Sequence, residues 1–296
     1  MTNEMLTVLE IIKKTTDFFA AKGIESPRLN AELLIGHALQ RKRMQLYLEF
    51  ERPLAEAELE LIRPLVRRRA QHEPVQYIVG ETEFLGLKLK VDRRALIPRQ
   101  ETELLVENVR TAWGEAVAPA RILDLGTGSG AIALALAQAF PEAQVTATDR
   151  SADALALARE NAERSGFSAR VQFLQADWFE GVLAESYDVI VSNPPYLTAE
   201  ETAQTALEVR GFEPVSALTA ADAGLADLKR IVTGSPAFLA SGGLLALETG
   251  IAQREALLEA ARAAGFSQVE FKRDLTDRDR FVLARLEKNG VTPVAP

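Results

Sequence analysis

The stretch from residue 121 to residue 136 reads RILDLGTGSGAIALAL, and it decides the fold. A short apolar strand leads into a glycine-rich loop, and an Ala/Leu run typical of a buried helix follows. Glycines let the backbone turn tightly and approach a ligand, because no Cβ stands in the way. The helix after them would offer free N–H groups and its positive dipole end. The stretch therefore predicts a strand, loop and helix of an α/β sheet, with a cofactor at the loop.

Apolar strands and helical runs alternate along the rest of this half of the chain. Helices are expected mainly at 152–165, 224–240 and 252–264, and the expected strands are 121–125, 145–148, 171–174, 187–192, 243–248, 269–271 and 281–285. Such alternation predicts a doubly wound parallel sheet. The loop between the last two strands is too short for a helical crossover, so those two should pair antiparallel. Residues 95–296 are thus predicted to form an α/β domain with a seven-stranded, mostly parallel, Rossmann-like sheet.

The chain before this domain has a different pattern. Helical spacing over 3–22, 27–39, 42–49 and 54–71 predicts a small helical bundle at residues 1–73. From residue 74 to residue 92 the apolar residues alternate on both sides of Gly80, which predicts a β-hairpin. We therefore expect a hairpin linker at 74–94 between the two domains. The tail at 292–296 is expected to be frayed.

Composition narrows the class of protein. The chain has 296 residues, no Cys and only two His, which argues against a disulfide framework, a zinc site or a Ser-His-Asp triad. No structural metal is expected. No apolar run approaches the roughly 18 residues that would span a bilayer. The first residues lack a basic flank and a secretory apolar core, so we expect a cytoplasmic protein.

Charge is unevenly distributed along the chain. Residues 1–94 carry 16 Lys/Arg and 14 Asp/Glu, a net charge of +2, whereas residues 95–296 carry 18 and 28, a net charge of −10. Binding to duplex DNA rests on neutralising phosphates, which an acidic domain does poorly. The charge therefore counts against nucleic acid as a partner, although a local basic patch remains compatible with it.

A second motif, SNPPY at 192–196, closes an apolar strand and would lie at its carboxyl end. Pro194 and Pro195 have no N–H and a fixed φ, so the backbone is stiff and presents carbonyls without competing donors. Asn193 adds a side-chain carbonyl, and Tyr196 adds a flat aromatic face. Two acceptors beside an aromatic ring suit a planar –NH2 group, such as a carboxamide or the exocyclic amine of a base.

The residues around the glycine loop indicate which cofactor it holds. Gly126-x-Gly128-x-x-Ala131 fits a dinucleotide fingerprint loosely, so a hydride-transfer enzyme is one reading. Asp124 gives the form Asp-x-Gly-x-Gly-x-Gly, which S-adenosylmethionine enzymes use. An anion beside the loop would repel a pyrophosphate but suits a cationic sulfonium. The predicted cofactor is therefore S-adenosylmethionine, bound by the loop residues Gly126, Thr127, Gly128, Ser129 and Gly130.

Polar and aromatic residues at the ends of the next two strands complete the predicted cofactor site. Asp149 ends the second strand and is the expected acceptor for a ribose diol. Asp177 and Trp178 follow the third strand, where a carboxylate and an indole could bond and stack an adenine ring. Together with Asn193 they predict methyl transfer to a planar nitrogen. An adenine-N6 methyltransferase acting on DNA or RNA, an NAD-dependent dehydrogenase and a non-catalytic binding module remain as alternatives.

The chain resembles a known family, the protein-glutamine N5-methyltransferases that modify peptide chain release factors (the HemK or PrmC type). The resemblance covers nearly the whole chain and rests on the helical N-terminal bundle, Tyr77, Gly80 and Phe84 of the hairpin, LIPRQETE at 96–103, ILDLGTGSG at 122–130, DWF at 177–179, SNPPY at 192–196, FEP at 212–214, AL at 217–218 and LE at 247–248. Gln100 departs from the pattern, because a proline is common at that position.

The resemblance implies a reaction, a substrate and roles for the motif residues. Methyl transfer to the side-chain amide of the glutamine in the Gly-Gly-Gln loop of class 1 release factors would support translation termination. Gly126 to Gly130, Asp149 and Trp178 would bind S-adenosylmethionine, and Asn193 would touch both cofactor and glutamine. Pro194, Pro195 and Tyr196 would hold the glutamine amide, and the helical domain would dock the release factor.

The catalytic hypothesis assigns chemistry to Asn193, Pro194 and Tyr196. An amide nitrogen is a poor nucleophile because its lone pair is delocalised into the carbonyl. Asn193 Oδ1 and the Pro194 carbonyl would accept hydrogen bonds from its two N–H groups and stabilise charge that develops on the nitrogen. Tyr196 would hold the amide plane by stacking. No general base is needed before transfer, because the methylated nitrogen becomes acidic and loses its proton to water.

Overall fold

The computed structural model describes residues 6–114, 118–183 and 186–287, and its chain divides into two compact units. The helical unit comprises the residues up to Glu81 together with Ala206–Phe212. The sheet unit comprises Thr82–Thr205 and Glu213 onward. Each unit has its own buried apolar core. No helix in the described parts of the chain is both long enough and apolar enough to cross a membrane.

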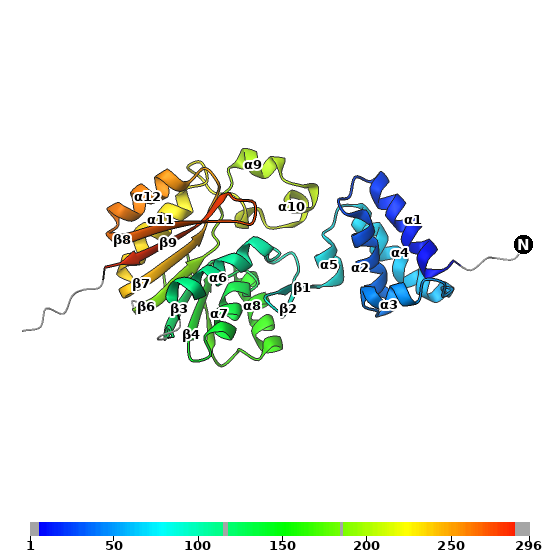
Figure 1. Cartoon of the computed structure of the whole chain (residues 1–296), viewed down its shortest axis with the longest axis horizontal. Coiled ribbons are helices and arrows are strands. Elements are labelled where there is room, and N and C mark those ends of the chain that lie inside the picture. The colour runs from blue at the N-terminus through cyan, green and yellow to red at the C-terminus, as the bar shows by residue number, and fades with distance from the viewer. Residues whose placement is uncertain (1–5, 115–117, 184–185, 288–296) are drawn as a thin grey trace, which may run out of the picture. The chain divides into compact units, whose positions relative to one another are not determined.

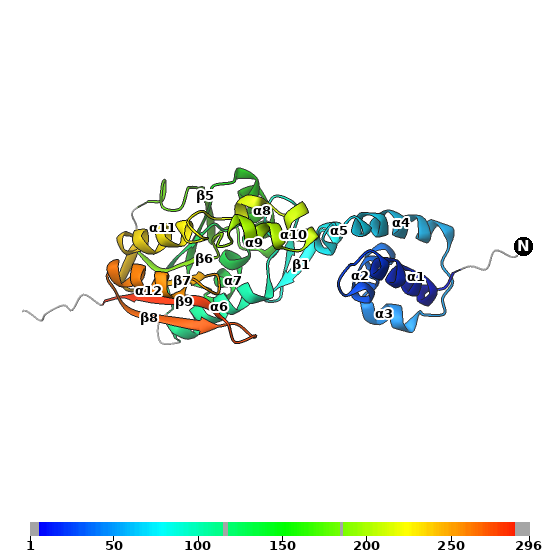
Figure 2. The ribbon, with the colours of Figure 1, turned by 90° about the horizontal axis from the view of Figure 1, so that it is seen from above.

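The helical unit is a bundle in which α2 contacts most of the other helices (Figure 2). Its elements are α1 (Val8–Ala21), α2 (Pro27–Leu39), α3 (Arg43–Leu48), α4 (Glu56–Ala70), α5 (Val75–Val79) and α10 (Leu207–Phe212). A capping box starts α1, because Thr7 Oγ1 accepts from Glu10 N and Glu10 Oε2 accepts from Thr7 N. The contacts among these helices confirm the predicted helical bundle. The first residues of its predicted first helix lie outside the described part of the chain.

A buried arginine connects α10 to the rest of the helical unit. Arg69 is 3% exposed and donates to Asn30 Oδ1 at 2.7 Å and to the Glu73 carbonyl at 3.1 Å. Its remaining nitrogen donates to Glu208 Oε2 at 2.6 Å. A buried guanidinium needs such partners, because leaving it unpaired would cost several kcal/mol.

Residues 75–79 correct one sequence prediction, because they form helix α5 and not a strand. Val75, Ile78 and Val79 all pack against the core of the bundle, which is the spacing of one helical face. Gly80 ends the helix with a φ of 84°. The hairpin that follows is shorter than predicted, with β1 at Glu81–Phe84 and β2 at Leu87–Lys90.

The sheet unit is built on a seven-stranded sheet with the order β5-β4-β3-β6-β7-β9-β8 (Figure 1). Its strands are β3 (Arg121–Leu125), β4 (Gln144–Asp149), β5 (Val171–Gln175), β6 (Tyr187–Ser192), β7 (Leu239–Glu248), β8 (Phe266–Arg273) and β9 (Asp279–Leu286). Strand β9 runs antiparallel to both of its neighbours, whereas β3 to β7 pair in parallel. The predicted fold class and the antiparallel pairing of the last two strands are confirmed.

Helices cover both faces of this sheet. Helices α6 (Gln100–Trp113) and α7 (Ala131–Ala139) share one core with the β1–β2 hairpin, and α8 (Ala152–Ser165) adds Ala162 to it. The opposite core contains residues of α11 (Ala226–Gly234) and α12 (Arg254–Ala263). Strand residues alternate between the two cores: in β3, Ile122 faces the first core, whereas Leu123 and Leu125 face the second.

The helix predicted at 224–240 is shorter in the structure. Helix α11 ends at Gly234, a 3₁₀ turn covers Ser235–Ala237, and β7 already begins at Leu239. Pro236 explains the difference, because it lacks the N–H that would continue the helix. The excursion after β6 carries a short helix α9 (Ala199–Gln204) and a 3₁₀ turn at Val215–Ala217. The tail at 292–296 lies outside the described residues.

Candidate active site

A cavity lies at the carboxyl ends of β3, β4, β5 and β6, where ligands of open α/β sheets bind. Most of the residues predicted for the site line it: Gly126, Thr127, Gly128, Ser129, Asp149, Asp177, Trp178, Asn193 and Pro195. Gly130, Pro194 and Tyr196 do not line it. Because the lining residues come from four strand ends, the parallel sheet itself gathers them in one place.

The glycine loop owes its shape to three residues with positive φ, Gly126 (71°), Gly128 (56°) and Gly130 (86°). A Cβ on Gly126 would lie 3.3 Å from the ring of Trp178, so only glycine lets the loop approach this indole. A Cβ on Gly130 would meet the Ala158 Cβ at 3.2 Å. Gly130 therefore sets the packing of α7 against α8, whereas the first two glycines lie at the cavity.

Asp124 does not face the cavity, contrary to the reasoning that placed an anion beside the cofactor. It is completely buried, and its Oδ2 accepts a 2.6 Å hydrogen bond from Thr127 Oγ1. Burial raises the pKa of Asp124 to about 7, against the hydrogen bond from Thr127, which lowers it. Asp124 therefore acts on the glycine loop from the buried side, through its hydrogen bond with Thr127.

Asp149 is held at the mouth of the glycine loop. Its Oδ2 accepts from Gly128 N at 2.9 Å, and its Oδ1 accepts from Ser151 N at 2.8 Å. A carboxylate offers about four lone-pair sites, so two acceptor sites are left for a diol. This geometry suits the predicted ribose contact.

Trp178 presents its indole to the cavity in a fixed orientation. Its backbone has a φ of 54°, and Nε1 donates to Asp227 Oδ1 at 3.0 Å. Asp177 Oδ1 accepts from Arg230 at 3.0 Å and lines the same cavity. The indole also packs against the core beneath α11 and α12, so it serves both core and cavity.

The SNPPY motif follows β6 and is tied down along its length. Ser192 Oγ donates to the Leu125 carbonyl at 2.6 Å, and Asn193 Nδ2 donates to Thr102 Oγ1 at 3.0 Å. Pro194 is buried. The Tyr196 hydroxyl donates to Glu248 Oε1 at 3.0 Å. Of the polar side chains in the motif, Asn193 is the one that lines the cavity.

Two residues behind this motif, Thr102 and Glu248, belong to stretches that carry the family resemblance, but sequence reasoning assigned neither of them a role. Glu248 is 2% exposed and accepts from Thr102 Oγ1 at 2.8 Å. Burial raises the pKa of Glu248, while the donors from Thr102 and Tyr196 and the charge of Arg280 lower it. Thr102 stands between Glu101 and Glu103 in the first turn of α6. A polar side chain at a position that the apolar pattern predicts to be buried is the sequence feature that could have identified both residues.

Glu213 and Arg99 form a second polar contact at the rim of the cavity. Glu213 is buried, and its Oε1 accepts from Arg99 at 2.5 Å while its Oε2 accepts from Ile97 N at 3.1 Å. Arg99 lines the cavity. The carboxylate therefore fixes the segment that enters α6.

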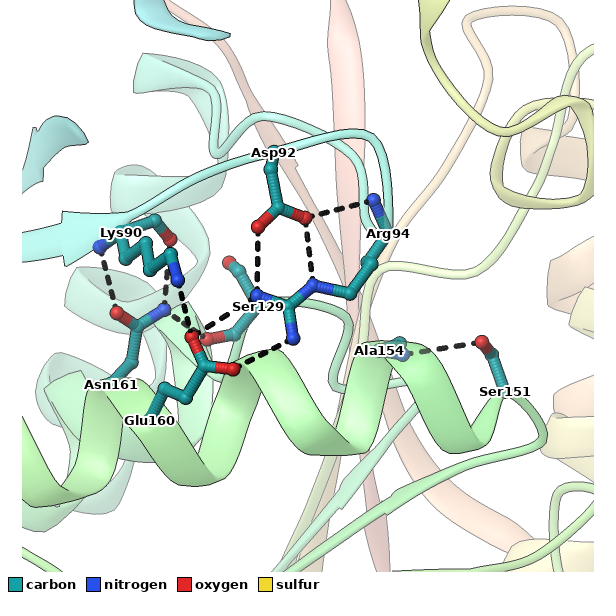
Figure 3. A network of polar contacts seen from close by, with 8 residues as sticks. All are labelled: Lys90, Asp92, Arg94, Ser129, Ser151, Ala154, Glu160 and Asn161. Atoms are coloured by element: carbon teal, nitrogen blue, oxygen red, sulfur yellow. Dashed lines mark hydrogen bonds and ion pairs between the residues drawn. The ribbon is translucent and has the colours of Figure 1, made fainter. Parts of the chain in front are cut away.

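Figure 3 shows how the end of the hairpin is fastened to α8 and to the glycine loop. Asn161 is fully buried; its Nδ2 donates to the carbonyls of Lys90 and Ser129, and its Oδ1 accepts from Lys90 N. Beside it, Arg94 pairs with Asp92 and Glu160 and lines the cavity. Hydrogen bonds from Arg94 and Lys90 lower the pKa of Glu160 to about 2. Asn161 thus anchors the glycine loop through the backbone carbonyl of Ser129.

Two protein families match the chain. The PrmC N-terminal domain matches residues 10–80, and the Methyltransferase small domain matches residues 99–210. The release factor glutamine methyltransferase of Chlorobaculum tepidum is 44% identical over 286 residues, which cover 93% of this chain and 95% of that protein. The release factor glutamine methyltransferase of Escherichia coli is 42% identical over 261 residues, which cover 88% of this chain and 93% of that protein.

Solved structures support the fold. A methyltransferase from Pyrococcus furiosus has a TM-score of 0.53 and 18% identity over 75% of this chain and 98% of that one. The Thermus thermophilus 16S rRNA N2-G1207 methyltransferase, solved with AdoMet and guanosine, has a TM-score of 0.51 and 21% identity over 70% of this chain and 50% of that one. At these identities the likeness concerns the fold alone.

Proposed function

This chain belongs to the release factor glutamine methyltransferase family, and on that premise we propose which of its residues carry out the reaction. The enzyme transfers a methyl group from S-adenosylmethionine to a glutamine side-chain amide of a peptide chain release factor. The observation that carries the residue assignment is that Asn193 lines the same cavity as Gly126 to Ser129 and Asp149. One cavity thus offers both a cofactor cradle and an amide acceptor.

The residues of the cavity suit S-adenosylmethionine. The close approach of Gly126 to the indole of Trp178 leaves a slot that a Cβ would fill. The Asp149 carboxylate, with two backbone donors already bound, still has acceptor sites for a ribose diol. The loop from Gly126 to Gly130, Asp177 and Trp178 would hold the rest of the molecule. The bound cofactor supplies an electrophilic methyl group on a sulfonium.

We propose that Asn193, Pro194 and Tyr196 act on the glutamine. The Asn193 side-chain carbonyl and the Pro194 backbone carbonyl would accept hydrogen bonds from the two amide N–H groups, which holds the nitrogen and stabilises positive charge as it develops. Pro195 keeps the segment stiff, because its ring fixes φ. Tyr196 would bound the amide plane, and its hydroxyl is anchored to Glu248. Orientation of this kind contributes up to about 7–11 kcal/mol in favourable cases.

The finer assignments concern the partner and the place of action. We propose that the substrate glutamine is that of the Gly-Gly-Gln loop of class 1 release factors, and that residues 1–73 dock the factor, with 74–94 as the linker and 95–296 as the methyltransferase domain. We propose that the chain acts in the cytoplasm and without a nucleic-acid partner. The net charge of −10 on residues 95–296 supports this, because DNA binding needs phosphate neutralisation.

Tritiated methyl transfer from S-adenosylmethionine tests this proposal. Parallel reactions contain a purified release factor, the same factor with its loop glutamine changed to alanine, and DNA. Label in the intact factor alone is the expected result. Label that persists after the glutamine is changed would move the site elsewhere on the factor, and label in DNA would favour the adenine-N6 alternative.

A further inference from the structure

We propose that Thr102 and Glu248 are positioning residues that fix the side-chain amide of Asn193 with its carbonyl oxygen toward the substrate. The inference rests on the proposed role of Asn193 as an acceptor for the glutamine amide. Thr102 lies in the first turn of α6, and Glu248 is the last residue of β7. Both are buried, and Thr102 also lines the cavity; the proposed role requires neither of them to touch the glutamine itself.

The direction of each hydrogen bond follows from the number of available protons. Thr102 has one hydroxyl proton, and it points to Glu248 Oε2 at 2.8 Å. The Thr102 oxygen therefore turns only lone pairs toward Asn193, 3.0 Å away. An amide NH2 can pair with those lone pairs, whereas an amide oxygen in the same place would be repelled. The proton count thus selects one of the two orientations that an asparagine amide can adopt.

The other oxygen of Glu248 also accepts a hydrogen bond. We call the chain of hydrogen bonds from Asn193 through Thr102 to Glu248 the relay, and this second bond keeps Glu248 in place as its final acceptor. Tyr196 donates its hydroxyl proton to Oε1 at 3.0 Å. With one donor on each oxygen, the carboxylate satisfies both groups without carrying a proton of its own. Burial raises the pKa of Glu248, whereas the hydrogen bonds from Thr102 and Tyr196 and the charge of Arg280 lower it. The direction of the relay rests instead on the geometry, with one hydroxyl donor on each carboxylate oxygen. Glu248 therefore acts as the fixed end of the chain Glu248, Thr102, Asn193.

This orientation matters for the kind of group that can be methylated. A glutamine amide presents two N–H donors, so it needs acceptors opposite it. With Asn193 held as described, Nδ2 is used by Thr102 and Oδ1 remains as the acceptor. A reversed Asn193 would turn its own NH2 toward the substrate NH2. The relay therefore selects a donor group such as an amide and disfavours an acceptor group such as a glutamate carboxylate.

The decisive variants remove or keep the Thr102 hydroxyl. Thr102→Val has nearly the same shape but no hydroxyl, and Thr102→Ser keeps the hydroxyl with less volume. Steady-state kcat and KM with a release factor, the Kd for S-adenosylmethionine and the thermal midpoint are measured for each. We expect kcat of Thr102→Val to fall about 10- to 100-fold, by analogy with the loss of a group that orients a metal-ligating side chain. The cofactor Kd should stay near that of the unmodified chain, and Thr102→Ser should restore kcat.

Two further variants keep the test decisive. Glu248→Leu removes the acceptor that directs the Thr102 proton, so it should lower kcat as Thr102→Val does. Ser235→Ala removes a buried hydroxyl that donates to the Ile231 carbonyl away from the cavity, and it should leave kcat unchanged. Unchanged kcat in Thr102→Val, or equal losses in Thr102→Val and Thr102→Ser, would overturn the positioning role. An unmodified chain that labels no release factor would instead refute the proposed function, and the positioning role with it.

Discussion

Two aspartates near the glycine loop show how similar residues acquire different tasks. Asp149 ends β4 at the cavity and keeps acceptor sites available, whereas Asp124 is buried under the loop. Both side chains lie on the same face of the sheet, because Asp124 pairs in register with Ala147, two residues before Asp149. Asp149 is the last residue of β4 and reaches the cavity, whereas Asp124 lies deeper in the sheet, in the core next to α7. Its neighbour Thr127 holds it there by a hydrogen bond. Although Asp124 is close in sequence to the first glycine of the loop, its side chain does not line the cavity.

The first prediction concerns Asn193. Asn193→Ala should lower kcat on a release factor about 100- to 1000-fold, by analogy with the loss of one oxyanion-hole donor. Cofactor affinity should change far less, because the glycine loop and Asp149 remain. Calorimetric titration with S-adenosylmethionine and single-turnover methylation would separate the two effects. Turnover near that of the unmodified chain would refute the assigned role.

A second prediction uses the raised pKa of Asp124, which burial shifts from 3.8 to about 7. A carboxyl with a raised pKa in the folded state stabilises the fold fully below its unfolded pKa, and this contribution is lost as the pH rises through 7. Asp124→Asn cannot ionise, so it escapes that loss. Without cofactor, the variant should match the unmodified protein at pH 4 and exceed its unfolding free energy at pH 8 by up to about 4 kcal/mol.

Urea denaturation of both proteins at the two pH values measures this difference. Comparing the difference between the proteins, and not the absolute stability of either, cancels the other groups that titrate between pH 4 and pH 8. A variant that is less stable than the unmodified protein at pH 8 would mean that the ionised carboxylate is stabilised in the fold, against the prediction.

Backbone conformation at a few loop positions governs how the elements meet at the site. Residues 222 to 224 all have positive φ, and Gly224 lies against the SNPPY motif. A Cβ on Gly224 would stand 2.1 Å from the Tyr196 carbonyl oxygen and 2.7 Å from Gln253 Nε2. Gln253 Nε2 itself donates to the Tyr196 and Gly224 carbonyls, at 3.0 and 3.1 Å. The loop before α11 thus sets the position of the motif after β6.

The third prediction compares two glycines with nearly equal φ. Gly166 ends α8 with a φ of 77° and has open space where a Cβ would be, whereas Gly224 has a φ of 79° and no such space. Gly166→Ala should cost about 1–2 kcal/mol of backbone strain. Gly224→Ala should cost clearly more and also lower kcat, because the Tyr196 carbonyl must move. Urea unfolding and methylation assays of both variants test this; equal stability losses with unchanged kcat would contradict it.

The two compact units have separate cores, which lets their contributions be tested apart. The core of the helical unit is formed by α1, α2, α3, α4 and α5, and that of the sheet unit by two layers on either side of the sheet. If the helical unit docks the release factor, cofactor binding and substrate docking should be separable.

The fourth prediction concerns a chain that starts at Thr82. It should bind S-adenosylmethionine with an affinity close to that of the full chain, because all the residues that line the cavity are retained. Its kcat/KM on an intact release factor should fall at least about 100-fold, equivalent to about 3 kcal/mol of lost docking energy. A short peptide with the Gly-Gly-Gln sequence serves as the control, and both chains should methylate it equally. Undiminished kcat/KM on the intact factor would show that docking lies elsewhere.

The amino-acid sequence by itself determined the order of elements, the fold class and the two motifs at strand ends. These features are local, because side-chain periodicity and glycine positions act over a few residues. The predicted strands of the sheet and most helix positions agree with the structure. Helix α5 differs because its five residues fit two patterns: apolar positions 75, 77 and 79 alternate as in a strand, whereas 75, 78 and 79 lie on one face of a helix.

Only the tertiary structure decided which polar groups meet. The bond from Thr102 to Glu248 joins residues 146 positions apart, and the bond from Asn193 to Thr102 joins residues 91 positions apart. Likewise, the burial of Asp124 depends on the helix that packs over β3. Hydrogen-bond direction and desolvation depend on groups that chain folding brings together, so no local pattern contains them. The sequence therefore predicts where the chemistry occurs, and the fold determines which way each proton points.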